Sequence, residues 1–246
     1  MPCAFLDFPR PLAFAHRGGS AHSPENSWPA FEHAVGLGYA YMETDVQATA
    51  DGVVIAFHDR TLDRLTGRPG RIAQLEHRDL AAARIDGTEP IPLLEDLLGA
   101  WPDIRFNVDV KDSAAIGPLA EVLRRTAAWD RVCISSFSGS RLRATRRTLG
   151  RPVCMATSPA AIAAVRLGAR PGSSVHCAQV PAAVASAPFV RRAHELGLQV
   201  HAWTVNDRGR MAALLDRGVD GIMTDETVTL REVLASRGQW HPRRPA

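Results

Sequence analysis

Residues 40–46 read AYMETDV, an apolar segment that contains two acidic side chains, Glu43 and Asp45, two positions apart. Alternate side chains of a β-strand point to the same face, so a strand here places both carboxylates side by side. The remaining residues suit a strand that is buried on both faces, as in a parallel sheet covered by helices. The segment therefore predicts a buried parallel strand that carries two acids.

Seven further segments have the same short, apolar character. They are residues 12–16 (LAFAH), 104–110 (IRFNVDV), 132–137 (VCISSF), 152–157 (PVCMAT), 174–180 (SVHCAQV), 199–205 (QVHAWTV) and 221–225 (GIMTD). Segments with helical spacing of apolar residues lie between most of them, at 30–35, 119–127, 160–167, 190–196 and 211–215. Eight strands alternating with helices in 246 residues predict an α/β fold, a (β/α)₈ TIM barrel.

The interval between the second and third strands is longer than the others. It contains a further apolar run at residues 53–57 (VVIAF), a loop rich in Gly and Arg around 67–70, and a helical segment at 93–98. We expect a short extra strand and a loop excursion over residues 62–89, inserted after strand 2. No Pro-, Gly- or Ser-rich linker divides the chain, which predicts a single domain over residues 1–246, with a frayed tail at 240–246.

The composition argues for an ordinary globular protein, with 46% apolar and 22% charged residues. No apolar run reaches the length of about 18 residues that a transmembrane helix requires. The first ten residues lack the basic and apolar regions of a signal peptide, which predicts a cytoplasmic protein. The four cysteines are far apart and form no CxxC pair, so we expect buried thiols in a reducing compartment; they are Cys3, Cys133, Cys154 and Cys177.

The charges are unevenly distributed along the chain. Residues 1–121 have a net charge of −8, residues 122–170 of +9 and residues 171–246 of +2. The basic middle contains arginines on helical stretches without interleaved aromatic residues, which favours a solvated helix face over a nucleic-acid surface. We therefore expect a small-molecule partner and no nucleic acid, and both a monomer and a homodimer are compatible with the sequence.

Active sites of such barrels lie at the C-terminal ends of the strands. Glu43 and Asp45 on the second strand and Asp109 on the third would place three carboxylates inside the barrel. Their repulsion in a low-dielectric interior requires positive charge. Oxygen ligands favour a hard divalent cation, Mg²⁺ or Ca²⁺, over zinc. The alternative is a buried salt-bridge cluster of the acids with Arg17 and Lys111, the one lysine of the chain.

Two histidines stand at predicted strand ends beside acids, His16 after the first strand and His58 after the extra strand. Imidazole titrates near neutral pH, so the two together are candidates for a general acid and a general base. His176 and His201, which fall in strands, are the runners-up. Trp203, near the end of the seventh strand, is either core or a wall against an apolar part of the substrate. Asn26 or Ser27 is expected to cap the first helix, and Glu25 is a weaker candidate for a role in the chemistry.

Nine stretches in order along the chain resemble the glycerophosphodiester phosphodiesterase family, whose barrels are similar to that of phospholipase C. They are AHRGGS at 15–20, PENS at 24–27, METDVQATADGVVIAFHD at 42–59, LDRLTG at 62–67, IPLLEDLL at 91–98, VDVK at 108–111, SSF at 135–137, AWTVN at 202–206 and GVDGIMTD at 218–225. The resemblance implies a hydrolase of lipid and glycerol metabolism that uses a divalent metal to convert glycerophosphodiesters to glycerol 3-phosphate and an alcohol.

The resemblance also assigns roles to individual residues. It implies that His16 and His58 are catalytic, that Arg17 and Lys111 contact the phosphate, and that Trp203 lies near the glycerol. It implies that Glu43, Asp45 and Asp109 bind the metal. The sequence departs from the family at Asp109, where a glutamate is usual. Both water and the glycerol 2-hydroxyl fit as the nucleophile, and either histidine can be the acid or the base.

Two alternative functions remain compatible with the sequence. Related barrels act on lipids as lysophospholipase D or as enzymes resembling sphingomyelinase D, although the short and charged excursion at 62–89 favours a soluble substrate. A non-catalytic barrel that binds phosphodiesters is the other alternative, supported only by the shortened side chain of Asp109. The sequence does not distinguish choline, ethanolamine, glycerol or inositol as the head group.

Overall fold

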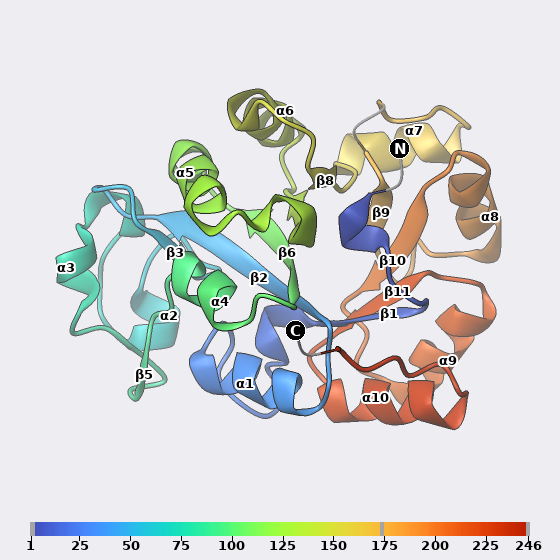
Figure 1. Ribbon diagram of the computed structural model, residues 1–246, viewed down its shortest axis with the longest axis horizontal. Helices are drawn as coiled ribbons and strands as arrows, with labels where there is room; N and C mark the ends of the chain where they lie inside the picture. The colour runs from blue at the N-terminus through green and yellow to red at the C-terminus, as the bar shows by residue number, and fades with distance from the viewer. Residues whose placement is uncertain (1–2, 173–174, 245–246) are drawn as a thin grey trace.

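Eight parallel strands form the centre of the protein in the computed structural model, which describes residues 3–172 and 175–244 (Figure 1). They are β1 (Leu12–Ala15), β2 (Tyr41–Ala48), β6 (Arg105–Val110), β7 (Val132–Ser135), β8 (Cys154–Met155), β9 (Cys177–Pro181), β10 (Gln199–Trp203) and β11 (Gly221–Thr224). Their order in the sheet is β8-β7-β6-β2-β1-β11-β10-β9, with all neighbours parallel. The predicted α/β barrel is thereby confirmed.

The barrel closes between β8 and β9 through a minimal contact. A single parallel bridge joins Ala156 and Cys177, and the amide of Thr157 donates to the carbonyl of Cys177 at 2.9 Å. Strand β8 is shorter than the predicted 152–157, because Pro152 has no N–H to donate to a neighbouring strand. Ser174 of the predicted strand 174–180 lies outside the described residues.

Helices on the outside of the barrel follow the strands. They are α1 (Trp28–Gly36), α4 (Leu94–Ala100), α5 (Ile116–Thr126), α6 (Gly139–Leu149), α7 (Pro159–Arg166), α8 (Ala187–Glu195), α9 (Arg208–Asp216) and α10 (Thr227–Ser236). The short 3₁₀ turns are η1 (Ala4–Leu6), η2 (His16–Gly18), η3 (Ile72–Gln74), η4 (Ser113–Ala115) and η5 (Ala128–Arg131). Ser27 is the cap of α1, since its side chain accepts from the amide of Ala30. Helix α10 was not predicted, because it opens with the β-branched run Thr-Val-Thr, which favours strands.

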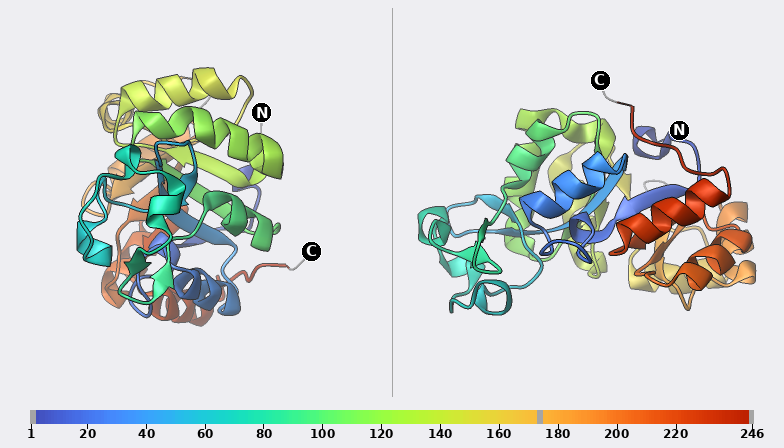
Figure 2. Two further views of the ribbon diagram at one scale, coloured as in Figure 1. Left: turned by 90° about the vertical axis from the view of Figure 1, so that its left-hand side faces the viewer. Right: turned by 90° about the horizontal axis from the view of Figure 1, so that it is seen from below.

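The predicted extra strand and excursion are both present after β2. Strand β3 (Val54–Ala56) pairs antiparallel with β2, and α2 (Asp63–Thr66), α3 (His77–Leu80) and the hairpin of β4 (Arg84–Ile85) and β5 (Glu89–Pro90) follow. This part projects from one side of the barrel (Figure 2). It has an apolar cluster of its own, in which Ile55 and Phe57 of the β3 region pack with Leu62, Ile72 and Ile85. That cluster anchors the chain on either side of His58.

The segments at the two chain ends pack on the N-terminal end of the barrel. Phe5 of η1 contacts the rings of Phe14 and Tyr41, and the Tyr41 hydroxyl donates to the Phe5 carbonyl at 2.6 Å. The prediction of a frayed tail is wrong for residues 240–244, because Trp240 packs on the ring of Tyr39 and Arg243 pairs with Asp103 at 3.0 Å. Residues 245–246 lie outside the described part of the chain. Among the described residues, no helix combines the length and apolar character that a membrane crossing requires.

Candidate active site

A cavity of about 550 Å³ opens at the C-terminal ends of the barrel strands. All eight residues singled out from the sequence line it, namely His16, Arg17, Glu43, Asp45, His58, Asp109, Lys111 and Trp203. They come from β2, β6 and β10, from the turn η2 that follows β1, and from the segments directly after β3 and β6, so the barrel unites positions up to 187 residues apart. The fold therefore gathers the predicted site in one place.

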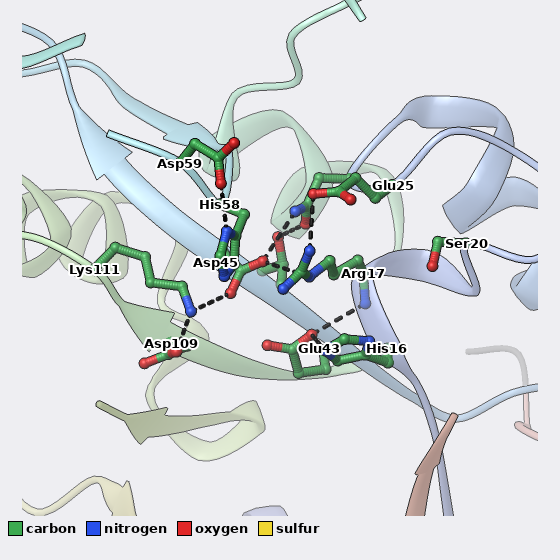
Figure 3. A network of polar contacts seen from close by, with 12 residues as sticks. His16, Arg17, Ser20, Glu25, Glu43, Asp45, His58, Asp59, Asp109 and Lys111 are labelled. Atoms are coloured by element: carbon green, nitrogen blue, oxygen red, sulfur yellow. Dashed lines mark hydrogen bonds and ion pairs between the residues drawn. The ribbon is translucent and has the colours of Figure 1, made fainter. Parts of the chain in front are cut away.

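Three carboxylates lie on the inner wall of this cavity, and each is about 5% exposed or less. Glu43 and Asp45 belong to β2, and Asp109 stands opposite Asp45 in the register of β2 and β6. The ammonium of Lys111 lies between two of them, 2.8 Å from Asp45 Oδ1 and 2.6 Å from Asp109 Oδ2 (Figure 3). The expected acidic trio is present, and the salt-bridge cluster considered as its alternative is present with it.

The acids of this trio differ in how well their charge is compensated. Burial, together with the neighbouring charge of Asp45, raises the pKa of Glu43 to about 7. Burial also raises the pKa of Asp109, although Lys111 opposes the effect. For Asp45 burial is outweighed by Lys111 and Arg17, so that its pKa is lowered. Lys111 and Arg17 therefore compensate the charge of Asp45 but only part of the charge of Glu43 and Asp109.

His16 is held by a carboxylate from the last strand. Its Nδ1 lies 2.7 Å from Asp225 Oδ1, and its Nε2 lies 3.8 Å from Glu43 Oε2. Burial alone would lower the pKa of His16, but the two carboxylates outweigh it and the pKa is raised. Asp225 also accepts hydrogen bonds from Ser20 and Asn206. Burial alone would raise the pKa of Asp225, but these hydrogen bonds and the contact with His16 outweigh burial and lower that pKa to about 2. The ring of His16 is thus fixed by a permanently charged partner.

His58 has a similar arrangement on the opposite side of Arg17. Its Nδ1 lies 2.6 Å from Asp59 Oδ1, and Arg64 Nε donates to the other Asp59 oxygen at 2.6 Å. Arg64 in turn donates to both oxygens of Glu25. In each histidine it is therefore Nδ1 that contacts an aspartate, and Nε2 is the nitrogen left for a substrate.

Arg17 connects the two histidine arrangements. Its backbone amide donates to Glu43 at 3.0 Å, its Nη1 donates to Glu25 at 2.9 Å, and its Nε lies 3.1 Å from Asp45 Oδ2. The residue has φ of 52°, a left-handed conformation that is costly for a side chain with a Cβ. The following Gly18 is also left-handed, and a Cβ there would lie 2.8 Å from that of Ala30. The tight turn after β1 thereby aims both the amide and the guanidinium of Arg17 at the acids.

Several residues of the site were missed or assigned a lesser role from the sequence. Asp225 is the last residue of a predicted strand, as His16 is, and that position was the available signal. Asn26, considered as a helix cap, is instead fully buried, where it donates to Asp45 Oδ2 at 3.1 Å and accepts from the Thr44 hydroxyl. Glu25 has a clearer role than expected, since it positions Arg17.

The far side of the cavity is apolar. Trp203 at the end of β10 meets Phe137 edge to face, with ring centroids 5.5 Å apart. The ring of Phe137 also lies 5.4 Å from the ammonium of Lys111, yet its side chain is 61% exposed. Pro159 and Ile162 continue this wall. The cavity thus offers a charged half and an apolar half to one molecule.

The charged half has the donor chemistry of a hard cation. Its ligands would be oxygens alone, and Oδ1 of Asp109 is buried without a hydrogen-bond partner. However, these three carboxylates do not form a set of oxygens that lie within 4.8 Å of one another. Among the described residues, the sets of three donor atoms within 4.8 Å of one another consist of cysteines, in one case with a histidine. The residues fit a divalent cation in type and in charge, and Lys111 stands close to where it would bind.

Comparison with known proteins places the chain in a family. Residues 16–229 match the model of the glycerophosphoryl diester phosphodiesterase family. The chain belongs to this family. It is 42% identical to "Probable glycerophosphodiester phosphodiesterase 2" of Mycobacterium tuberculosis over 93% of this chain and 92% of the relative. The chain is therefore an enzyme, a glycerophosphodiester phosphodiesterase.

Solved structures of the family share the barrel. A glycerophosphodiester phosphodiesterase of Agrobacterium tumefaciens has a TM-score of 0.79 at 19% identity, covering 89% of this chain and 98% of that one. A phosphodiesterase of Oleispira antarctica, in complex with the product sn-glycerol-3-phosphate, has a TM-score of 0.79 at 22% identity, covering 92% and 97%. At these identities the likeness establishes the fold.

Proposed function

We propose that this phosphodiesterase hydrolyses a soluble glycerophosphodiester to glycerol 3-phosphate and an alcohol, with His16 and His58 as the proton-transfer pair. The observation that carries the proposal is that both histidines, each bound through Nδ1 to an aspartate, line the cavity that contains the buried acids. The complex of the Oleispira antarctica structure with sn-glycerol-3-phosphate supports the product class.

The positive groups of the site suit an anionic phosphodiester. Arg17 is held in place by Glu25, and Lys111 by Asp45 and Asp109, so both can meet phosphate oxygens without reorganising. Glu43, Asp45 and Asp109 would hold one divalent cation, Mg²⁺ or Ca²⁺, and the shorter Asp109 has the unpaired oxygen Oδ1 for it. When bound, such a cation supplies further positive charge to the phosphate oxygens.

The proton transfers follow from the two histidines. One takes the proton of the nucleophile, water or the glycerol 2-hydroxyl, as its oxygen forms a bond to phosphorus. The other gives a proton to the alcohol oxygen as the bond between that oxygen and phosphorus breaks. With water this step gives glycerol 3-phosphate directly, whereas with the 2-hydroxyl it gives a cyclic phosphate, which a water molecule then opens to glycerol 3-phosphate. The raised pKa of His16 favours its protonated form and hence the acid role. His58 is then the base, oriented by Asp59.

The apolar half of the cavity is the proposed place for the rest of the substrate. Trp203 would pack against the glycerol side, and Phe137 at the mouth against the departing alcohol. The exposure of Phe137 also favours a second candidate, a lysophospholipid whose chain would lie on that ring. We further propose that residues 1–246 act as one domain, in a reducing compartment such as the cytoplasm, in keeping with four free cysteines.

A panel of substrates tests this function. Glycerophosphocholine, glycerophosphoethanolamine, glycerophosphoglycerol, glycerophosphoinositol and a lysophospholipid are assayed with chelator, Mg²⁺ or Ca²⁺. Glycerol 3-phosphate is measured for the four soluble diesters, and lysophosphatidic acid for the lysophospholipid. We expect metal-dependent release from at least one soluble diester. Turnover of the lysophospholipid alone would establish the second candidate, and turnover without any dependence on metal would contradict the cation site.

A further inference from the structure

The four cysteines, which are far apart in the sequence, meet at the N-terminal end of the barrel. Cys154 and Cys177 open β8 and β9, Cys133 is the second residue of β7, and Cys133 pairs with Cys154 in the register. The Sγ atoms of these three residues all lie within 4.8 Å of one another, and each residue is at most 3% exposed. The cluster therefore lies at the end of the barrel opposite the active site.

The spacing of the sulfurs is that of a metal–thiolate site. The Sγ atoms of Cys133 and Cys177 are 3.9 Å apart. A Zn–S bond of about 2.3 Å in a tetrahedral site gives sulfurs separated by about 3.8 Å. Cys3, just before η1, provides a fourth sulfur within 4.8 Å of that of Cys154. Three mutually close sulfurs are thus present, and the Sγ of Cys3 lies near Cys154 in a second set that also includes a ring nitrogen of His176.

A base stands beside the cluster. His201 of β10 is fully buried next to Cys177, and its Nδ1 makes no hydrogen bond. Its Nε2 lies 3.2 Å from Gln199 Oε1, to which it can donate, which leaves Nδ1 as the unprotonated nitrogen. This nitrogen can accept the proton that a thiol loses when its sulfur binds a metal.

We propose that Cys133, Cys154, Cys177 and Cys3 bind one thiophilic divalent cation, Zn²⁺, which joins β7, β8 and β9 to the N-terminal segment. Binding replaces the S–H bonds by Zn–S bonds and releases the protons to water. The site lies where the barrel closes by a single bridge between Ala156 and Cys177, so the cation adds a link at its weakest seam. Cys3, the one cysteine of the four that is not fully buried, is on the entry side.

Two measurements on the purified, reduced, full-length chain test the site. Metal-free protein is titrated with Co²⁺, and the thiolate-to-cobalt charge-transfer absorption is recorded, which carboxylate ligands do not produce. The melting temperature is then measured with and without Zn²⁺. We expect the charge-transfer band to saturate at one equivalent, and the melting temperature to rise by about 5–10 °C at saturating Zn²⁺.

Variants separate this site from the active site. Cys154→Ala should abolish the band and the rise in melting temperature. Val153→Ala, a packing loss at the neighbouring position, and Glu43→Gln in the active site should retain both. If Cys154→Ala does not fold, Cys3→Ala serves instead and should weaken Zn²⁺ binding at least tenfold.

Three outcomes would overturn the proposal. Folded wild-type protein could show no charge-transfer band. The band could persist at full strength in both Cys154→Ala and Cys3→Ala. Or the native chain could have a mass lower by a pair of hydrogens and bind no zinc, which would show that two of these cysteines form a disulfide instead.

Discussion

The two ends of the same barrel present opposite chemistry. The C-terminal end gathers three buried carboxylates with Lys111 and Arg17, whereas the N-terminal end gathers four sulfurs among the rings of Phe5, Phe14 and Tyr41. At the first end burial and neighbouring charges shift the pKa of the three acids and of Lys111, and the acids would repel one another without cations. At the second, the cysteines pack as small apolar groups, and burial raises the pKa of the Cys133 and Cys154 thiols.

The difference shows what each end requires of the sequence. A charged end needs a whole set of compensating partners, so its residues are tied to one another through Glu25, Arg64 and Asp225. The N-terminal end requires only small side chains at the first positions of neighbouring strands, at the same height in the barrel. A variant that changes one end can therefore be compared with a matched variant elsewhere in the molecule.

The largest effect is expected from the two histidines. His16→Ala and His58→Ala should each lower kcat by about 10²–10⁴-fold, because each removes one proton transfer. Circular dichroism should show an unchanged fold. His77→Ala, at an exposed position of α3, is the matched control and should stay within a few-fold of wild type. Comparable activity of His16→Ala and His77→Ala would remove His16 from the mechanism.

The next effect concerns the ammonium between the acids. Lys111→Met keeps the stem of the side chain but removes the ion-pair partner of Asp109 and one of the two ion-pair partners of Asp45. Loss of one partner of a buried pair costs about 3–5 kcal/mol. We expect the free energy of unfolding of metal-free protein to fall by that order and Mg²⁺ to restore part of it. kcat/KM should fall as well, since a phosphate contact is lost.

The control for this variant is Arg208→Met, which breaks an exposed pair with Glu232. It should leave the unfolding free energy nearly unchanged and insensitive to Mg²⁺. If both variants respond to Mg²⁺ in the same way, the acids do not form the cation site.

Glu43 makes the stability of the charged end depend on pH. Its pKa in the folded protein is about 7, above the ordinary value, so the folded state holds a proton that the unfolded chain has lost. The contribution of this proton to the free energy of unfolding is therefore present at acidic pH and is lost as the pH rises through about 7. It amounts to at most about 3 kcal/mol from the size of the shift. Glu43→Gln should remove this part of the pH dependence in urea unfolding of metal-free protein, between about pH 4.5 and 7.5, and an unchanged slope would contradict it.

The smallest effect is expected for Asp225→Asn. The amide keeps the contact with His16 but not the charge, so the pKa of His16 should fall, and kcat/KM should fall by about 10–100-fold. The pKa of the general acid in the pH profile of kcat/KM should therefore move to lower pH. Substitution of a residue with a purely structural role would not cause this shift. Asp130→Asn, at an exposed position of η5, should leave the profile unchanged.

The sequence predicted the barrel because eight apolar segments alternate with helical ones, and it predicted the site because polar residues stand where those segments end. Asp225 was missed because a single acid after a strand has no distinctive spacing. The hairpin β4–β5 was missed because two-residue strands carry no periodicity. The cysteine cluster was missed because closeness in a barrel depends on strand register, although each of the three buried cysteines lies in a predicted strand.

The central claim is that the acids of the charged end hold the cation that turnover requires. The most direct test is the rate of glycerol 3-phosphate release by chelator-treated enzyme as a function of Mg²⁺ or Ca²⁺ concentration. Wild type, Glu43→Gln and, as the control, Glu195→Gln at an exposed position of α8 are compared. The account predicts no activity without metal, full recovery for wild type and Glu195→Gln, and a requirement for at least about tenfold more metal in Glu43→Gln. Full activity of wild type without metal, or identical metal curves for all three proteins, would contradict it.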